Sequence, residues 1–252
     1  MDRKQEKILG FGVDLFDFKD ALSYIEEKTE SSQPAQVVTI NPEMIELAEK
    51  NPQFANVLRN AELVIPDGVG IKIALKINGI NQEQIPGIEF SKEVISMCAK
   101  KGYPVSLIGA REDILVKACD NLVQEFSGLN IAYKRNGFFN ENEEMEIIAE
   151  ISNIKPKLVL VALGAPKQEF FINKLREQLQ DAVYIGVGGS FDVWSGEVQR
   201  APVIYRKLGC EWLYRLLMQP SRFKRIFPTL PLFLIKVIMV RFKELIFGKA
   251  QV

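Results

Sequence analysis

A carboxylate stands in this sequence where it could act as a base. Asp67 follows the apolar run Leu63–Ile65 and precedes Gly68, so it lies in a turn at the end of a predicted strand. The chain contains no histidine, and any proton transfer must therefore use a carboxylate, Lys, Tyr or Cys. Asp67 is thus a candidate general base. The alternative is that Asp-Gly forms only a turn here, which is a common role for this pair.

A second polar pair belongs to the apolar segment Val37–Ile40 and the residue after it. The two-residue period of a strand places Thr39 and Asn41 on one side, just before a helix that is predicted to begin at Pro42. Two interpretations are open. Either both side chains face a ligand, or Asn41 caps the helix and Thr39 is an ordinary strand residue, which the spacing alone favours.

Two Gly-containing turns form the third candidate, and their chemistry would be phosphate binding. Each follows an apolar run, and Pro166 in the first turn stands near the opening of a predicted helix. Backbone N–H groups exposed at such turns favour phosphate. Together with Gln168, the glycines Gly164, Gly188 and Gly189 suggest a cradle for a nucleotide diphosphate.

These glycines do not match the two best-known nucleotide-binding patterns. In a dinucleotide-binding fingerprint a third Gly or Ala would stand at Phe191, and an acid would stand about 20 residues further on, where Arg206 and Lys207 are found. No Walker A pattern occurs. The sequence also lacks an Asp-x-Asp pair, histidine and paired cysteines, so we expect no metal cofactor.

The elements that must position these residues alternate along the chain. Short β-branched runs predict strands at Val37–Ile40, Leu63–Ile65, Val105–Ile108, Ile131–Tyr133, Leu158–Ala162 and Val183–Val187. Amphipathic stretches predict helices at Phe18–Thr29, Glu43–Asn51, Gln53–Arg59, Val69–Lys76, Ser91–Lys100, Glu112–Phe126, Glu141–Ile154 and Lys167–Leu179. Apolar strands separated by helices indicate an α/β fold with a mostly parallel, Rossmann-like sheet covered on both faces. Ligands of such sheets bind beyond the carboxyl ends of the strands, where the candidate residues stand.

The C-terminal segment differs from the rest in charge. Residues 200–252 hold eleven Lys and Arg against two acids, a net charge of +9 that leaves −9 for the rest of this neutral chain. They also hold the apolar run Ile226–Val240, which Pro228, Pro231 and Lys236 interrupt. This run is shorter than the about 20 residues of a spanning helix. We therefore expect residues 1–199 to form the α/β catalytic domain, followed by a basic, apolar helical appendage that lies on an anionic membrane. The alternative is a buried C-terminal helix with solvated charges.

Composition narrows the location and the partners. No apolar stretch follows the charged start of the chain, so we expect no secretion. Cys98, Cys119 and Cys210 are widely spaced, which is typical of reduced thiols in the cytoplasm. We expect a cytoplasmic protein bound peripherally to the inner face of the cell membrane, with no nucleic-acid partner. Its apolar face should make it a homo-oligomer when no membrane is present.

Five long motifs in this sequence resemble a known family. They are TINPEM, IPDGVGI, LVALGAPKQE, GVGGSFDVWSGEVQRAP and LGCEWLYRLLMQPSRFKR, in this order and over almost the whole chain. On these residues the chain is similar to the WecG/TagA/CpsF family of bacterial glycosyltransferases. The resemblance implies metal-independent, inverting transfer of a sugar, typically N-acetylmannosamine, from its UDP donor to N-acetylglucosamine linked to undecaprenyl diphosphate. This is a step of wall teichoic acid or other surface polysaccharide synthesis.

The resemblance also implies roles for individual residues. Asp67 would be the general base, because inverting transfer needs one base and no second nucleophilic carboxylate. Thr39, Asn41 and Gln168 would belong to the substrate pocket.

Three tail arginines, Arg215, Arg222 and Arg225, would close over the diphosphate. Without an Asp-x-Asp pair to hold a metal, arginine side chains must stabilise the departing UDP. Arg222 and Arg225 are three residues apart and directly precede the apolar run. Membrane docking and completion of the site would then be one event. The alternative is that these arginines contact only solvent or lipid headgroups.

Some positions depart from the family pattern. Gln84 stands where the family often has Arg, and Glu89 where it often has Asp. Glucose and N-acetylmannosaminuronic acid are therefore alternative donor sugars. Arg111, after a predicted strand, either adds charge to the site or lies on the surface. A different class of protein, a non-catalytic peripheral membrane protein that binds a nucleotide or an anionic lipid, would use the same tail and glycines but would give Asp67 no role.

Overall fold

The computed structural model of the chain describes residues 3–202, 205, 213–214 and 223–248, and side chains of the last group only from residue 229 onward. The predicted diphosphate-binding residues Arg215 and Arg222 lie outside the described residues. Arg225 is described by its backbone alone.

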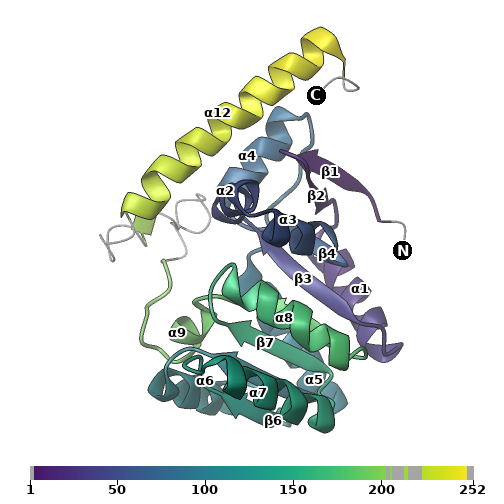
Figure 1. Ribbon diagram of the computed structural model, residues 1–252, viewed down its shortest axis with the longest axis vertical. Helices are drawn as coiled ribbons and strands as arrows, with labels where there is room; N and C mark the ends of the chain where they lie inside the picture. The colour runs from purple at the N-terminus through teal and green to yellow at the C-terminus, as the bar shows by residue number, and fades with distance from the viewer. Residues whose placement is uncertain (1–2, 203–204, 206–212, 215–222, 249–252) are drawn as a thin grey trace.

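Six strands form one parallel sheet, as the apolar runs predicted (Figure 1). They are β3 (Ala35–Ile40), β4 (Leu63–Pro66), β5 (Pro104–Gly109), β6 (Asn130–Arg135), β7 (Leu158–Ala162) and β8 (Val183–Gly186). Their order is β4-β3-β8-β7-β5-β6, and each neighbouring pair is parallel. All the carboxyl ends therefore meet at one edge of the sheet.

Helices cover both faces of this sheet. One face carries α1 (Phe18–Glu30), α5 (Gly87–Lys101), α6 (Glu112–Glu125) and α9 (Ser190–Trp194). The other face carries α2 (Pro42–Lys50), α3 (Pro52–Arg59), α4 (Val69–Ile77), α7 (Glu141–Ile154) and α8 (Lys167–Gln178). Successive side chains along each strand point to opposite faces of the sheet, so both faces gain apolar residues. Val37 faces the first group of helices and Val38 faces the second. The predicted α/β fold is confirmed.

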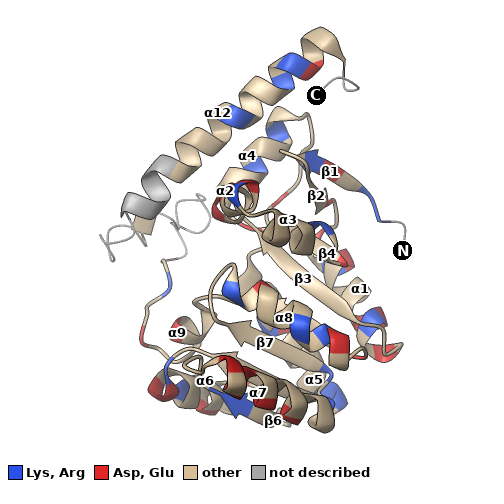
Figure 2. Ribbon diagram, viewed as in Figure 1, with Lys and Arg blue, Asp and Glu red and all other residues tan. Residues whose placement is uncertain are grey.

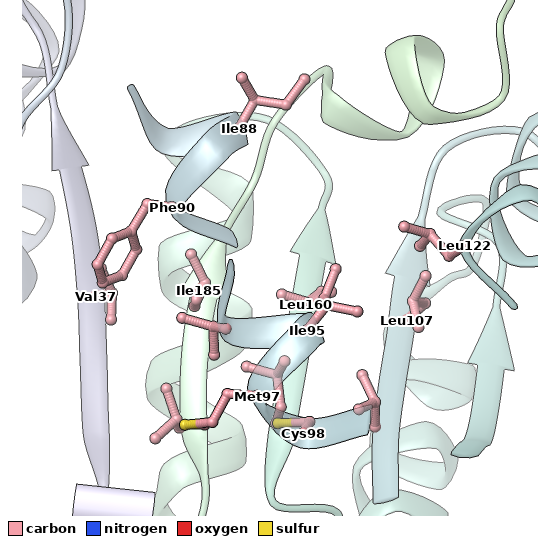
Figure 3. Close-up of a cluster of buried hydrophobic side chains, with 14 of the residues drawn as sticks. Val37, Ile88, Phe90, Ile95, Met97, Cys98, Leu107, Leu122, Leu160 and Ile185 are labelled. Atoms are coloured by element: carbon pink, nitrogen blue, oxygen red, sulfur yellow. The ribbon is translucent and has the colours of Figure 1, made fainter. Parts of the chain in front are cut away.

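The first of these cores is built between α5 and the strands. Figure 3 shows Phe90 and Ile95 of α5 beside Val37 and Leu160 of the sheet. All four side chains are at most 1% exposed, and burial of each contributes about 1.5–3 kcal/mol. The predicted start of this helix at Ser91 was wrong by four residues, because the packing of Phe90 and its neighbours draws the preceding turn into the helix.

The sequence did not predict the N-terminal hairpin, β1 (Gln5–Ile8) and β2 (Phe11–Asp14), or the short helix α9. The hairpin is held to the sheet through Asp14, whose buried carboxylate accepts hydrogen bonds from the backbone N–H of Val64 at 2.7 Å and from Arg3 Nε at 2.5 Å. This anchor joins residues far apart in the sequence, so local patterns could not reveal it.

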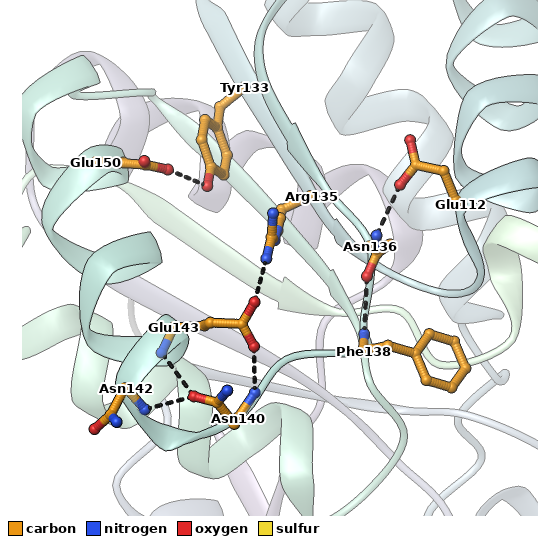
Figure 4. Close-up of polar contacts among 9 residues, drawn as sticks. All are labelled: Glu112, Tyr133, Arg135, Asn136, Phe138, Asn140, Asn142, Glu143 and Glu150. Carbon is orange, nitrogen blue, oxygen red and sulfur yellow. Dashed lines mark hydrogen bonds and ion pairs between the residues drawn. The ribbon is translucent and has the colours of Figure 1, made fainter.

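Polar residues surround the start of α7, beside β6, which is the edge strand farthest from β4 (Figure 4). Asn140 Oδ1 accepts from the N–H groups of Asn142 and Glu143, both at 3.0 Å, and Glu143 Oε2 accepts from Asn140 N at 2.9 Å. Glu143 also pairs with Arg135 of β6. This capping box fixes the entry to the helix and ties it to the edge strand.

Beyond the sheet, α12 (Phe223–Phe247) is one 25-residue helix, and Pro228 and Pro231 do not end it. Phe233 and Val237 are buried in the core formed by α2 and α4, and Lys236 Nζ lies 2.8 Å from Glu46 Oε1 of α2. The helix is therefore fixed on the α/β fold along one side.

The other side of α12 is exposed and apolar, and it includes the side chains of Leu232, Ile235, Ile238, Met239, Phe242, Leu245, Ile246 and Phe247. Figure 2 shows few charges along the described part of this helix. The buried side fits the interpretation as a packed C-terminal helix, and contact of the exposed side with a membrane stays a prediction. No helix among the described residues is long and apolar enough to cross a bilayer.

Candidate active site

A pocket of about 520 Å³ opens at the carboxyl edge of the sheet. It brings together seven residues that the sequence singled out: Thr39, Asn41, Asp67, Gly164, Gln168, Gly188 and Gly189. Six of them lie at or just after the ends of β3, β4, β7 and β8, which are neighbours in the sheet, and Gln168 lies in the first turn of α8. Their roles stay predictions, but their convergence is a finding.

The two sides of the pocket come from different halves of the chain. Thr39 lies near the end of β3, and Asp67 directly follows β4. The N–H of Asp67 donates to the carbonyl of Ile40 at 2.9 Å, which holds the two strand ends together. Gly87, the first residue of α5, lies against Thr39, because a Cβ on it would come within 2.7 Å of Thr39 Cγ2. The backbone therefore approaches closely behind the Thr39 side chain.

Asn41 fits both of its interpretations. Its Oδ1 accepts from the N–H of Met44 at 3.0 Å, so it caps α2. It also lines the pocket. The cap fixes the side chain of Asn41 at the pocket wall. A hydrogen bond to a ligand would therefore use the capacity of this amide that the bond from Met44 does not occupy.

On the opposite wall, Gln168 joins two loops. Its Oε1 accepts from the N–H of Gly164 at 3.2 Å, after β7, and from the N–H of Gly188 at 3.1 Å, after β8. Two N–H groups predicted to cradle phosphate thus bind a side chain of the protein. Gly164 and Gly188 have φ of 76° and 50°, conformations that suit glycine.

Other lining residues were not assigned a role from the sequence. Asp192 follows the second Gly-containing turn, and Glu43 stands in the first turn of α2. Tyr214, Thr229 and Leu230 reach the pocket from the C-terminal segment. The glycines Gly188 and Gly189 directed attention to the region of Asp192. No local sequence pattern indicated that the C-terminal segment reaches the pocket, because these contacts depend on tertiary packing.

The described lining contains carboxylates and no Lys or Arg. Gln84 lines the pocket, and its Oε1 is buried without a hydrogen-bond partner among the described residues. Arg200 pairs with Glu89. Arg111 is exposed and pairs with Asp113 at 2.9 Å, as its surface interpretation requires. None of the described residues that line the pocket is therefore a cation that could pair with a diphosphate.

A metal ion is the other source of positive charge that proteins use to bind a diphosphate. Within the part of the chain that the structure describes, no three Cys, Asp or Glu side chains form a group that could hold a metal ion. The absence of a cofactor stays a prediction.

Sequence comparison decides the family. Residues 6–245 match the glycosyl transferase WecG/TagA/CpsF family. The chain belongs to this family. It is a glycosyltransferase, and the resemblance seen in its motifs is confirmed.

One similar protein of the family comes from Bacillus spizizenii (strain ATCC 23059 / NRRL B-14472 / W23). It is 35% identical over 198 residues, which cover 78% of this chain and 76% of that protein. It is named N-acetylglucosaminyldiphosphoundecaprenol N-acetyl-beta-D-mannosaminyltransferase. The pocket lies within the part of the chain that matches the family.

Proposed function

We propose that this glycosyltransferase moves N-acetylmannosamine from UDP to N-acetylglucosamine linked to undecaprenyl diphosphate, with inversion at the anomeric carbon. The observation that carries the proposal is the convergence of Asp67, Thr39 and Gln168 in one pocket of a chain from this family. The name of the Bacillus relative supports the choice of donor and acceptor.

In the proposed reaction Asp67 acts as the general base. Its carboxylate takes the proton from the acceptor hydroxyl as the hydroxyl oxygen attacks the anomeric carbon, and the bond to UDP breaks. Thr39 and Asn41 lie beside it in the pocket and would orient the sugars. One base is sufficient, because attack and departure occur in a single displacement.

The negative charge that develops on UDP needs a partner, and the described lining offers no Lys or Arg. Arg215, Arg222 and Arg225 stand in the C-terminal segment that also brings Tyr214 and Leu230 to the pocket. We assign the diphosphate to these arginines, with no metal taking part. Guanidinium groups match phosphate oxygens in pairs, so they suit this task.

The acceptor is anchored in a membrane, and the exposed apolar side of α12 suits contact with one. The same helix carries the basic residues Arg241, which pairs with Glu244 at 3.1 Å, and Lys243, which is exposed. Apolar burial combined with attraction to anionic lipids is how peripheral helices bind a bilayer. We infer peripheral binding to the cytoplasmic face of the cell membrane, and self-association through the same side when no membrane is present.

The test is a transfer assay with the purified chain, a lipid-diphosphate N-acetylglucosamine acceptor and a panel of UDP-sugars. The panel includes UDP-glucose and UDP-N-acetylmannosaminuronic acid, because Gln84 replaces an expected arginine in the pocket wall. The proposal expects UDP release only with acceptor present and fastest with UDP-N-acetylmannosamine. Binding of UDP without any release would identify a non-catalytic binding protein instead.

A further inference from the structure

Two adjacent polar residues of α8 are both buried behind the pocket. Gln168 is 5% exposed and Glu169 is 2% exposed. Gln168 lines the pocket and has a place in the proposed reaction. Glu169 does not line the pocket, and the reaction as described gives its carboxyl group no task.

Glu169 controls which way the Gln168 amide faces. Gln168 Oε1 accepts from the backbone N–H groups of Gly164 and Gly188, and its Nε2 donates to Glu169 Oε1 at 2.8 Å. If the amide turned over, its NH₂ would face two N–H donors and its oxygen would face a carboxyl oxygen. The acceptor on Glu169 therefore selects the orientation in which Gln168 joins the loops after β7 and β8.

Little space remains for any other arrangement. A Cβ at Gly186 would lie 2.5 Å from Gln168 Nε2 and 3.1 Å from Glu169 Oε1. The absence of a side chain at Gly186 is what admits both groups against the end of β8. The Gln168–Glu169 pair thus occupies a site that fits it closely.

Stability alone does not account for the carboxyl group. Glu169 Oε2 is buried with no hydrogen-bond partner among the described residues, and such burial is unfavourable. Desolvation raises the pKa of Glu169 to about 7. An apolar side chain of similar size would avoid this cost, although it would remove the acceptor of Gln168 Nε2. The buried carboxyl group therefore adds little net stability, and we look for its role in function.

We propose that Glu169 is a positioning residue for the transferase: through Gln168 it fixes the two strand-end loops of the pocket and directs the second N–H of the Gln168 amide to the bound substrate. The proposal rests on the proposed function for its effect on turnover. Its structural part, the ordering of Gly164 and Gly188 by a correctly oriented Gln168, can be measured without any substrate.

The experiment compares Glu169→Gln, Glu169→Leu and Glu169→Asp with the parent chain. Glu169→Gln keeps an acceptor oxygen, Glu169→Leu removes it, and Glu169→Asp shortens the side chain so that it no longer reaches Gln168. Glu177→Leu is the control, because Glu177 is an exposed glutamate on the same helix. The measurements are kcat and KM for transfer, the unfolding midpoint, and hydrogen exchange of the Gly164 and Gly188 amides.

The proposal expects Glu169→Leu to fold with an unfolding midpoint close to that of the parent, because relief of the buried carboxyl group offsets the lost hydrogen bond to Gln168. The variant should lose at least tenfold in kcat. Exchange at Gly164 and Gly188 should be at least tenfold faster. Glu169→Asp should behave similarly in kcat and exchange, whereas Glu169→Gln and Glu177→Leu should stay within threefold of the parent. Loss of turnover without loss of stability is not what a purely structural residue would produce.

Parental kcat and exchange in both Glu169→Leu and Glu169→Asp would overturn the proposal. So would equal losses in Glu169→Gln and Glu169→Leu, since the charge of the carboxyl group and not the orientation of Gln168 would then matter. If Glu169→Leu fails to fold, the other two variants test the proposal: it requires lower kcat and faster exchange in Glu169→Asp than in Glu169→Gln. If the parent chain transfers no sugar, the proposed function fails, and the exchange measurement still decides the structural part.

Discussion

Phe233 and Phe242 lie on one helix in opposite surroundings: Phe233 is fully buried against α2 and α4, and Phe242 is 63% exposed. Nine residues correspond to two and a half helical turns, which places the two rings on opposite sides of α12. The same helix thus contributes to the core on one side and presents an apolar surface on the other.

This relationship predicts different effects of the same substitution. Phe233→Ala should reduce the free energy of unfolding by about 3–5 kcal/mol, because it leaves a cavity in the core. Phe242→Ala should change it by less than about 0.5 kcal/mol, but should weaken binding to anionic vesicles. Denaturant unfolding and vesicle flotation measure the two effects. Unchanged vesicle binding by Phe242→Ala would argue against docking through this side of the helix.

Replacement of the proposed base should stop the chemistry and spare binding. We expect Asp67→Asn to lower the transfer rate about 10²–10⁴-fold, the usual contribution of a general base, while UDP affinity by calorimetry stays near that of the parent. Thr39→Ala and Asn41→Ala should have smaller effects on rate, because these residues would orient substrates without moving a proton. Activity of Asp67→Asn within a few-fold of the parent would exclude Asp67 as the base.

Charge stabilisation by arginine predicts insensitivity to chelators. Transfer should proceed at nearly the same rate with EDTA present and without added Mg²⁺ or Mn²⁺. Strict dependence on either ion would show that a metal takes the place assigned to the arginines, and Asp67 would then be examined as a ligand.

The same assignment predicts the behaviour of the tail arginines. Arg222→Ala and Arg225→Ala should reduce transfer even to a short-chain, water-soluble acceptor, because the residues would hold diphosphate and not lipid headgroups. Arg241→Ala, farther along the helix, is the matched control and should retain activity on this acceptor. Full activity of Arg222→Ala and Arg225→Ala would show that these residues do not bind the diphosphate, and the C-terminal segment would then serve only to anchor the protein.

The buried Glu169 predicts a pH effect on stability. Desolvation raises its pKa to about 7 in the folded protein, against about 4.3 in the unfolded chain. The folded state therefore binds this proton more tightly, so protonated Glu169 makes a contribution to stability that is fully present below about pH 4 and is lost as pH rises through about 7. The contribution that is lost amounts to about 4 kcal/mol. In Glu169→Gln this part of the pH dependence should be absent, which denaturant titrations at pH 5 and 8 would detect.

Much of the fold followed from local patterns. Runs such as Leu158–Ala162 are buried throughout, and the sequence placed each of the six parallel strands to within two residues at either end. The glycines and the Asp67 turn pointed to the correct edge of the sheet for the same reason: parallel strands all end there.

The rest depended on contacts between distant residues. The hairpin of β1 and β2 is held by Asp14 against Val64, fifty residues away. Gln168 looked like a ligand-binding residue, but its contacts with Gly188 and Glu169 show that it also joins two loops. The side of α12 that faces the core could not be chosen from its composition, because apolar residues lie all around it.

The order of the strands also bears on how the protein is made. β8, the last strand in the sequence, lies in the middle of the sheet between β3 and β7. A nascent chain that ends before Val183 has one pair of strands, β4 and β3, and one group of three, β7, β5 and β6, with no strand hydrogen-bonded to both. Because the pocket uses residues from each group, its two walls are joined through the sheet only when β8 is inserted. Assembly of the active site must therefore come late in synthesis.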